Sequence, residues 1–389
     1  MNAPKLRFKE FTDEWIAIKL NDISKTFDYG MNVASTSFDG KNKYIRITDI
    51  DDVSHKFLKN NIVSPSGSLE DKYLVKNDDI LFARTGASTG KTYLYNSNDG
   101  ILYFAGFLIR INVLKSYNSY FIFQNTLTKK YTDWVKVESI RSGQPGINAE
   151  QYKSYSIKCP TLAEQNKITN FLTTVDKKIT NLENTITSLE NQKKGLLQQI
   201  FSQKLRFKDK NGNNYPNWEK KKLEDIAIFL DNKRKPLEQS ERIHGKYPYY
   251  GASGIIDYIN DYIFDEELVL LSEDGANIID RNYPICYIAT GKYWVNNHAH
   301  VLKVKSQYVN KFICESLEQL NYTKYNTGTA QPKLNQDVCR KIILSIPCLE
   351  EQTKIANFLS TFDRKLENQK AQLEHWKQIK KGLSQQMFV

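Results

Sequence analysis

Cysteine is scarce in this 389-residue chain, which has five, and no two of them are spaced as Cys-x-x-Cys. An odd number without that spacing argues against a disulfide framework and against a structural zinc site. Long apolar runs are also missing: no stretch approaches the ~20 residues of a membrane helix, and no apolar N-terminal segment follows basic residues. We therefore expect a soluble, cytoplasmic protein without a membrane contact.

Sequence motifs of catalytic sites are also scarce. The Asn/Asp-Pro-Pro-Tyr/Phe motif of methyltransferases does not occur, so the chain should not bind a methyl donor itself. Glu-x-Lys patterns at residues 70–72 and 219–221 are weak nuclease signals that arise freely in charged sequences. His298 and His300 have no convincing third or fourth ligand nearby in sequence, so no metal site is predicted. A catalytic role for this chain is not predicted.

The segment RTGASTGKT at residues 84–92 resembles a phosphate-binding P-loop but is one residue short between Gly86 and Gly90. A P-loop also leads from a strand into a helix, whereas residues 79–83 and 92–95 both read as strands. The pattern therefore predicts a strand–turn–strand. The alternative left open is a stand-alone DNA-binding regulator, nuclease or ATPase that dimerises through helices.

What the sequence does have is positive charge and duplication. Lys and Arg number 55 against 44 Asp and Glu, which gives a formal net charge of +11 and favours a polyanionic partner such as nucleic acid. The segment beginning at Pro160, PTLAEQNKITNFLTTVDKKI, recurs from Pro347 as PCLEEQTKIANFLSTFDRKL, and KLRFK occurs at Lys5 and Lys204. The chain is therefore two copies of one module, which gives a pseudo-two-fold internal repeat.

The best-conserved part of each copy predicts a long helix. Apolar residues recur in steps of four and three, which is the seam of a coiled coil, and ~37 residues of helix span roughly 55 Å. Two separate amphipathic core helices are the alternative, but pairing is favoured because little else could cover them. Glycines at 195 and 382 share one register and suggest a close contact with a neighbouring domain or a partner protein. The seam comprises Ile168, Leu172, Val175, Ile179, Leu182, Ile186, Leu189, Ile355, Leu359, Phe362, Leu366, Leu373 and Trp376.

The remaining segments are unlike each other and strand-rich, with occasional helices expected at 117–130 and 309–320. The predicted fold is α+β, with globules at 1–159 and 204–346 and helices within 160–203 and 347–389. One local likeness persists, because residues 81–87 (LFARTGA) resemble residues 270–276 (LLSEDGA). The turn at residue 84 thus has a counterpart without any P-loop character.

Taken together, the duplicated helices, the Glu-Gln-x-Lys-Ile-x-Asn-Phe-Leu openings at Glu164 and Glu351, and the phrases at 249–254, 272–275 and 296–300 resemble the specificity subunit of type I restriction–modification systems. The resemblance covers essentially the whole chain. It implies two target recognition domains that each read half of a bipartite site in double-stranded DNA. It also implies an antiparallel helix pair that docks two adenine methyltransferase (modification) subunits, with restriction/translocase subunits completing the enzyme. S-adenosylmethionine, ATP and Mg²⁺ are then expected on those partners and no cofactor on this chain.

Side-chain chemistry indicates the candidates for DNA contact. Bases are read by Arg, Lys, Asn, Gln and acidic side chains, and phosphates are held by cations, hydroxyls and backbone N–H groups. Arg84 is the leading candidate, and Glu273 or Asp274 could accept a hydrogen bond from a cytosine amine. In the first module the candidates are Tyr29, Arg46, Thr48, Arg84, Thr85, Gly86, Ser88, Lys91, Arg141, Ser142 and Gln144. In the second they are Lys233, Arg234, Tyr250, Ser253, Glu273, Asp274, Asn277, Asn296, Asn297, His298 and Thr327.

Overall fold

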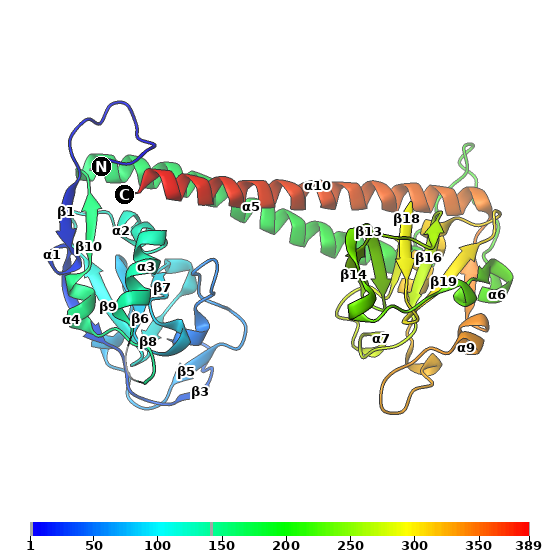
Figure 1. Ribbon diagram of the computed structural model, residues 1–389, viewed down its shortest axis with the longest axis horizontal. Helices are drawn as coiled ribbons and strands as arrows, with labels where there is room; N and C mark the ends of the chain where they lie inside the picture. The colour runs from blue at the N-terminus through cyan, green and yellow to red at the C-terminus, as the bar shows by residue number, and fades with distance from the viewer. Residues whose placement is uncertain (1–2, 141–142, 389) are drawn as a thin grey trace. The chain divides into compact units, whose positions relative to one another are not determined.

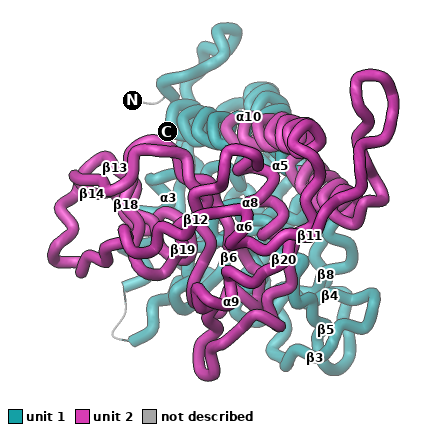
Figure 2. Tube along the Cα trace, turned by 90° about the vertical axis from the view of Figure 1, so that its right-hand side faces the viewer, with its two compact units in different colours: residues 1–183, 372–389 teal, residues 184–371 magenta. Residues whose placement is uncertain are grey.

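The computed structural model describes residues 3–140 and 143–388 (Figure 1). The chain divides into two compact units, coloured separately in Figure 2: residues 1–183 with 372–389, and residues 184–371. Each unit thus holds one globular module together with half of each long helix. The four-segment division expected from the sequence stays a prediction, and the compact units cut across it because both helices are shared. Among the described residues, no helix is long and apolar enough to cross a membrane.

The first module is built on an antiparallel sheet with the order β2-β9-β6-β7. Its strands and those of its two-stranded sheets are β1 (Ile16–Lys19), β2 (Ser24–Tyr29), β3 (Ser35–Ser37), β4 (Lys43–Ile45), β5 (Val63–Pro65), β6 (Asp79–Ala83), β7 (Thr92–Leu94), β8 (Leu102–Phe104), β9 (Leu108–Val113) and β10 (Ser156–Cys159). Its short helices are α1 (Leu20–Ile23), α2 (Ser119–Asn125), α3 (Lys129–Glu138) and α4 (Ala149–Ser154). Buried aromatic and aliphatic side chains such as Phe82, Ile111 and Phe121 form its core.

The second module repeats that sheet as β12-β19-β16-β17 and adds a second sheet, β14-β13-β18-β15. Its strands are β11 (Glu219–Lys222), β12 (Ala227–Phe229), β13 (His244–Gly251), β14 (Gly254–Ile259), β15 (Phe264–Asp265), β16 (Leu268–Ser272), β17 (Cys286–Ala289), β18 (Lys292–Val295), β19 (Ala299–Val304) and β20 (Ile343–Ile346). Its short helices are α6 (Leu223–Ile226), α7 (Asn277–Asp280), α8 (Asn310–Glu318) and α9 (Gln336–Arg340). The shared strand order shows that the duplication includes the globular parts, whose sequences have diverged.

The long helices are α5 (Leu162–Phe201) and α10 (Leu349–Met387), and they pair antiparallel within each unit. In the first unit Asp176 contacts Lys380 at 2.6 Å, and in the second Lys193 contacts Asp363 at 2.7 Å. These two ion pairs are the same contact in the two repeats, since each residue of one pair lies 187 positions from its equivalent. Polar pairs of this kind at a helix interface favour one register over others.

Apolar side chains fill the rest of the seam. All seven seam residues of α5 are buried, as are Ile355, Leu359, Leu366 and Leu373 of α10, while Phe362 and Trp376 are half-buried. Lys193 interrupts the apolar pattern because it is the cation of the ion pair with Asp363. Nothing lies within 4 Å of a Cβ placed on Gly195 or Gly382, so the described part of the chain does not supply the close contact expected at these glycines.

Each module is anchored to the helices by the repeated motifs. The buried Glu164 carboxylate accepts hydrogen bonds from Arg7 at 2.7 and 2.8 Å and from Trp15 at 3.3 Å. Its repeat, Glu351, binds Arg206 at the same two distances and Trp218 at 3.1 Å. The neighbouring glutamines, Gln165 and Gln352, are also buried and accept hydrogen bonds from the backbone at Asn118 and Val309. The Glu-Gln motif and the KLRFK arm are therefore one structural joint, built twice.

One expected element is wrong in its extent. The sequence predicted a single helix over residues 117–130, but α2 ends at Asn125 and α3 starts at Lys129. Thr128 causes the break, because its hydroxyl accepts a hydrogen bond from the Tyr131 N–H and caps the second helix. The helix expected over 309–320 is present as α8.

Candidate nucleic-acid interface

Three turns come together at the end of the shared sheet in the first module. The turn after β6 is held by Arg84 N–H donating to Phe107 O at 3.0 Å and by Gly86 N–H donating to Pro145 O at 2.9 Å. The third link is Ile147 N–H donating to Arg84 O at 2.9 Å. The segment before β9 and the segment around Pro145 are thereby fixed against the glycine turn.

The second module has the same three turns with the same backbone links. Glu273 N–H donates to His298 O at 2.9 Å, and Gly275 N–H donates to Pro332 O at 3.0 Å. Leu334 N–H donates to Glu273 O at 2.7 Å and completes the set. The counterpart relation between the turns at 84 and 273 is confirmed, and so is the strand–turn–strand, since β6 and β7 pair antiparallel. No helix follows Lys91, so the turn is not a P-loop.

The first module brings six of its candidates close together. The Arg84 guanidinium lies over the Tyr29 ring, 4.9 Å from its centroid, and its buried Nε has no hydrogen-bond partner among the described residues. Gly86 has a φ of +72°, and a Cβ there would lie 2.9 Å from the Gln144 Nε2 atom. The positive φ favours glycine at this position, whereas the amide end of the flexible Gln144 side chain can move away from a Cβ. Thr85 and Ser88 are half-buried in the same turn.

Two cations of the first module have internal partners instead. Arg46 makes a bidentate pair with Asp49, with distances of 2.8 and 2.9 Å. Lys91 is only 11% exposed and binds the Ile50 carbonyl at 3.0 Å and the Asp52 carboxylate. Thr48 is exposed in the short 3-10 helix Ile47–Asp49. Among the described residues, no hydrogen bond links it to the three turns. Arg141 and Ser142 fall outside the described residues.

In the second module part of the candidate set lines a pocket of about 290 Å³. It is lined by residues from the segments 251–256, 272–278 and 296–298 and by Tyr283 and Gln331. Five sequence candidates are among the lining: Ser253, Asp274, Asn277, Asn296 and His298. The buried side-chain amides of Asn277 and Asn296 hold the pocket lining in place. Asn277 donates to the Tyr283 carbonyl and accepts from the Tyr283 N–H, and Asn296 accepts from the His298 N–H.

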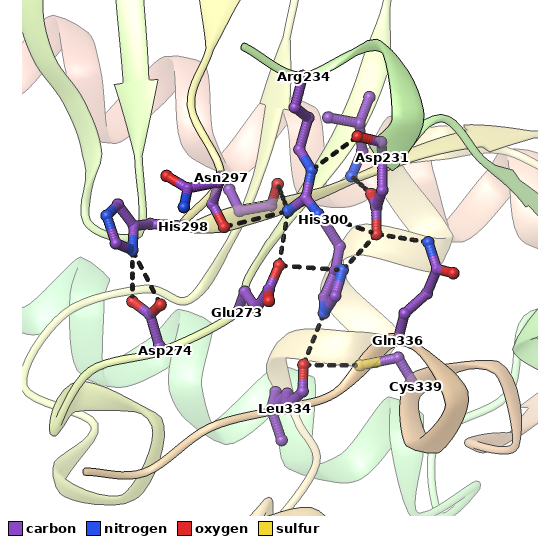
Figure 3. Close-up of polar contacts among 12 residues, drawn as sticks. Asp231, Arg234, Glu273, Asp274, Asn297, His298, His300, Leu334, Gln336 and Cys339 are labelled. Carbon is purple, nitrogen blue, oxygen red and sulfur yellow. Dashed lines mark hydrogen bonds and ion pairs between the residues drawn. The ribbon is translucent and has the colours of Figure 1, made fainter. Parts of the chain in front are cut away.

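A buried charge network supports these turns (Figure 3). The Glu273 carboxylate binds Arg234 at 2.6 Å and Lys333 at 3.3 Å, with Glu273 only 13% exposed. Arg234 also donates to the carbonyls of Asn297 and Ala299. Arg234 and Glu273 are thus held inside the module and position the turns, whereas Asp274 faces the pocket.

The remaining candidates of the second module lie outside the pocket lining. Lys233 and Asn297 are exposed, and half-buried Tyr250 packs against Tyr293 with ring centroids 5.5 Å apart. Exposed Thr327 is tied to Lys333 O through its backbone N–H at 2.8 Å. Gln331 lines the pocket but is not among the residues predicted from the sequence, although its repeat Gln144 is, and the 187-residue offset between the repeats points to it. Phe107, which is 56% exposed at the turn equivalent to His298 and carries no polar signal, is not among those predicted residues either.

Comparison with known proteins identifies this arrangement. A family model described as the type I restriction modification DNA specificity domain matches residues 12–191 and 215–375, so the chain belongs to that family and carries the domain twice. Its function is DNA sequence recognition within a type I restriction–modification system.

Individual relatives agree with that assignment. A putative type I restriction enzyme specificity subunit from Haemophilus influenzae is 38% identical over 139 residues, which cover 36% of each chain. The MjaVIII specificity subunit of Methanocaldococcus jannaschii is 23% identical over 85% of this chain and 83% of that protein. The crystal structure of a type I S subunit from M. genitalium has a TM-score of 0.64 at 17% identity, covering 100% of this chain and 99% of that one, and so shows the same fold.

Proposed function

We propose that each module reads one half of a bipartite site in double-stranded DNA with the surface formed by its three turns. The observation that carries this proposal is that one backbone frame is built twice and bears unlike side chains. The first module offers Arg84 and Phe107 where the second offers Glu273 and His298. Readers of two different short sequences need a common scaffold with different donors and acceptors.

The long helices are proposed to dock two adenine methyltransferase subunits. Gly195 and Gly382 leave open space at equivalent positions on α5 and α10, which suits the close approach of a partner chain at two related places. In this proposal the present chain is a non-catalytic, cytoplasmic subunit. S-adenosylmethionine, ATP and Mg²⁺ are held by the modification and restriction/translocase subunits.

The proposal is tested by co-expressing the chain with an adenine methyltransferase subunit of the same system and mapping methylated adenines by sequencing. We expect a split motif that appears only when both chains are present. A chimera that takes residues 15–150 from a relative should change one half of the motif and keep the other. Methylation without this chain, or a chimera that alters both halves, would contradict the proposal. DNA binding without any methylation would favour a free-standing regulator.

Replacement of Arg84 by alanine is expected to weaken binding of cognate DNA by about 1–3 kcal/mol, because its guanidinium has no carboxylate partner among the described residues and is oriented by Tyr29. A titration of labelled DNA at fixed salt measures this change. Arg46→Ala is the matched control, since Arg46 is already paired with Asp49, and it should affect DNA binding less.

The same variant separates base contact from phosphate contact. If Arg84 binds a base edge, Arg84→Ala relaxes the preference at one position of the first half-site. If it binds a phosphate, affinity falls uniformly across sequences and the salt slope decreases by about one. Unchanged affinity would remove Arg84 from the interface.

A further inference from the structure

An exposed carboxylate–imidazole pair stands at the edge of the pocket in the second module (Figure 3). His298 Nδ1 lies 2.8 and 3.0 Å from the two carboxylate oxygens of Asp274. The side chains are 49% and 21% exposed, respectively. An ionised carboxylate only accepts hydrogen bonds, so Nδ1 carries a proton, and with a single proton on the ring the Nε2 atom is left as an acceptor. Within the described chain, Nε2 has no partner.

The pair is held in place by the backbone on both sides. Asn296, which is 4% exposed, accepts a hydrogen bond from the His298 N–H at 2.8 Å. The His298 carbonyl accepts from Glu273 N–H at 2.9 Å, which ties the histidine turn to the turn that carries Asp274. Arg234 fixes the carbonyls of the residues before and after His298. These links orient both side chains before any ligand arrives.

The chemistry of this pair selects among bases. Asp274 and the Nε2 atom of His298 together present acceptors only. Adenine N6 and cytosine N4 offer amino donors in the major groove, whereas the groove edge of guanine offers N7 and O6 acceptors and that of thymine offers O4. If the acceptors of Asp274 and His298 face the acceptors of guanine or thymine, these polar groups lose water without gaining hydrogen bonds. That loss lowers the binding affinity.

We infer that the Asp274–His298 pair recognises the exocyclic amino group of an adenine or a cytosine in the second half-site and discriminates against guanine and thymine there. This inference rests on the proposed function and adds the chemical identity of what one module reads. The first module has Thr85 and Phe107 at the equivalent turns and does not form such a pair. His298 is therefore a specificity-determining residue of the second module alone.

The test uses the full chain assembled with its methyltransferase subunit and a DNA library randomised in both half-sites. His298→Phe installs the residue type that the first module has at this turn. We expect it to lower the preference for adenine or cytosine over guanine and thymine about ten-fold or more at one position of the second half-site. The first half-site, read by the other module, should be unchanged. The matched control is His244→Phe on β13, which lies outside the pocket lining and should retain every preference.

Base analogues give a second, independent measurement. Purine in place of adenine, or 2-pyrimidinone in place of cytosine, removes only the amino group. Wild-type protein should lose affinity for the analogue, and the His298→Phe protein should not distinguish it from the natural base. Unchanged second half-site preferences in His298→Phe, or a lost preference for guanine, would overturn the inference while leaving bipartite recognition intact. A wild-type complex without any sequence preference would overturn the proposed function as well.

Discussion

Replacement of Glu351 by alanine is expected to lower the free energy of unfolding of the second unit by about 3–5 kcal/mol. Glu351 is fully buried and holds Arg206 through two hydrogen bonds and Trp218 through a third. Arg206 is itself only 21% exposed, so loss of the carboxylate leaves a largely desolvated guanidinium without its counter-charge. Removal of one partner from a buried ion pair costs this much because the remaining charge is uncompensated.

Urea unfolding followed by circular dichroism measures the effect. Glu350→Ala is a close control, because it removes the same charge from the adjacent, exposed position in the first turn of α10. Its cost should stay within about 1 kcal/mol, the usual contribution of an acid near a helix N-terminus. Equal destabilisation by the two variants would show that the joint with Arg206 does not stabilise the unit.

The second large effect concerns pH and His300. This imidazole is 1% exposed, with Nδ1 2.6 Å from Asp231 and Nε2 2.7 Å from the Leu334 carbonyl. Burial by itself lowers the pKa of His300, but the hydrogen bond and negative charge of Asp231, with a further contribution from Cys339, outweigh it and raise the pKa to about 10. The ring is therefore an imidazolium that donates from both nitrogens.

The sign of the pH dependence follows from that raised pKa. An unfolded histidine has a pKa near 6.5, so the stabilisation is fully present below about pH 6.5 and is lost as the pH rises through 10. We expect the free energy of unfolding to fall by roughly 3–5 kcal/mol across this window. In His300→Gln this fall should be much smaller. Chemical denaturation at a series of pH values checks it.

A control separates this histidine from general alkaline effects. The same exchange at exposed His244 should keep the wild-type fall of stability with pH. A His300→Gln protein that retains the full fall would show that other groups titrate in this range. Because Leu334 lies in the third of the three turns and Asp231 follows β12, loss of the imidazolium proton is also expected to loosen the turns that we propose to read DNA.

Features that depend on the repeat could be predicted from the sequence. The long helices follow from the 187-residue offset and from apolar periodicity, and the likeness of the turns at 84 and 273 follows from the match between residues 81–87 and 270–276. The antiparallel arrangement of the helices was implied by the family resemblance. The interruption of the apolar seam at Lys193 was visible in the sequence. Its partner, Asp363, was not, because pairing across two helices is a tertiary contact without a local signal.

The roles of the individual residues within the candidate site were harder to predict. Glu273 and Asp274 are adjacent acids, and no propensity distinguishes the one that holds Arg234 from the one that faces the pocket. The same is true of Arg46 and Arg84, of which only Arg46 has a carboxylate within reach among the described residues. Arg234, which decides the role of Glu273, lies 39 residues away in sequence, so only the folded module brings the two together. Asp49 lies three residues from Arg46, and these residue types at that spacing do not by themselves predict an ion pair.

The joint between arm and helix has a consequence for chain connectivity. In the second unit the polypeptide runs directly from the end of α5 into the arm, and Leu205 N–H donates to Gln199 O at 3.0 Å. In the first unit Leu6 N–H makes the equivalent bond to Gln386 O of α10 at 2.9 Å, without a covalent connection between the two segments. A short peptide that joins the segment after Gln386 to the segment before Leu6 would thus make the same connection in the first unit that residues 201–204 make in the second. The chain could then be opened at those residues, which would give a circularly permuted protein with its two modules in exchanged order.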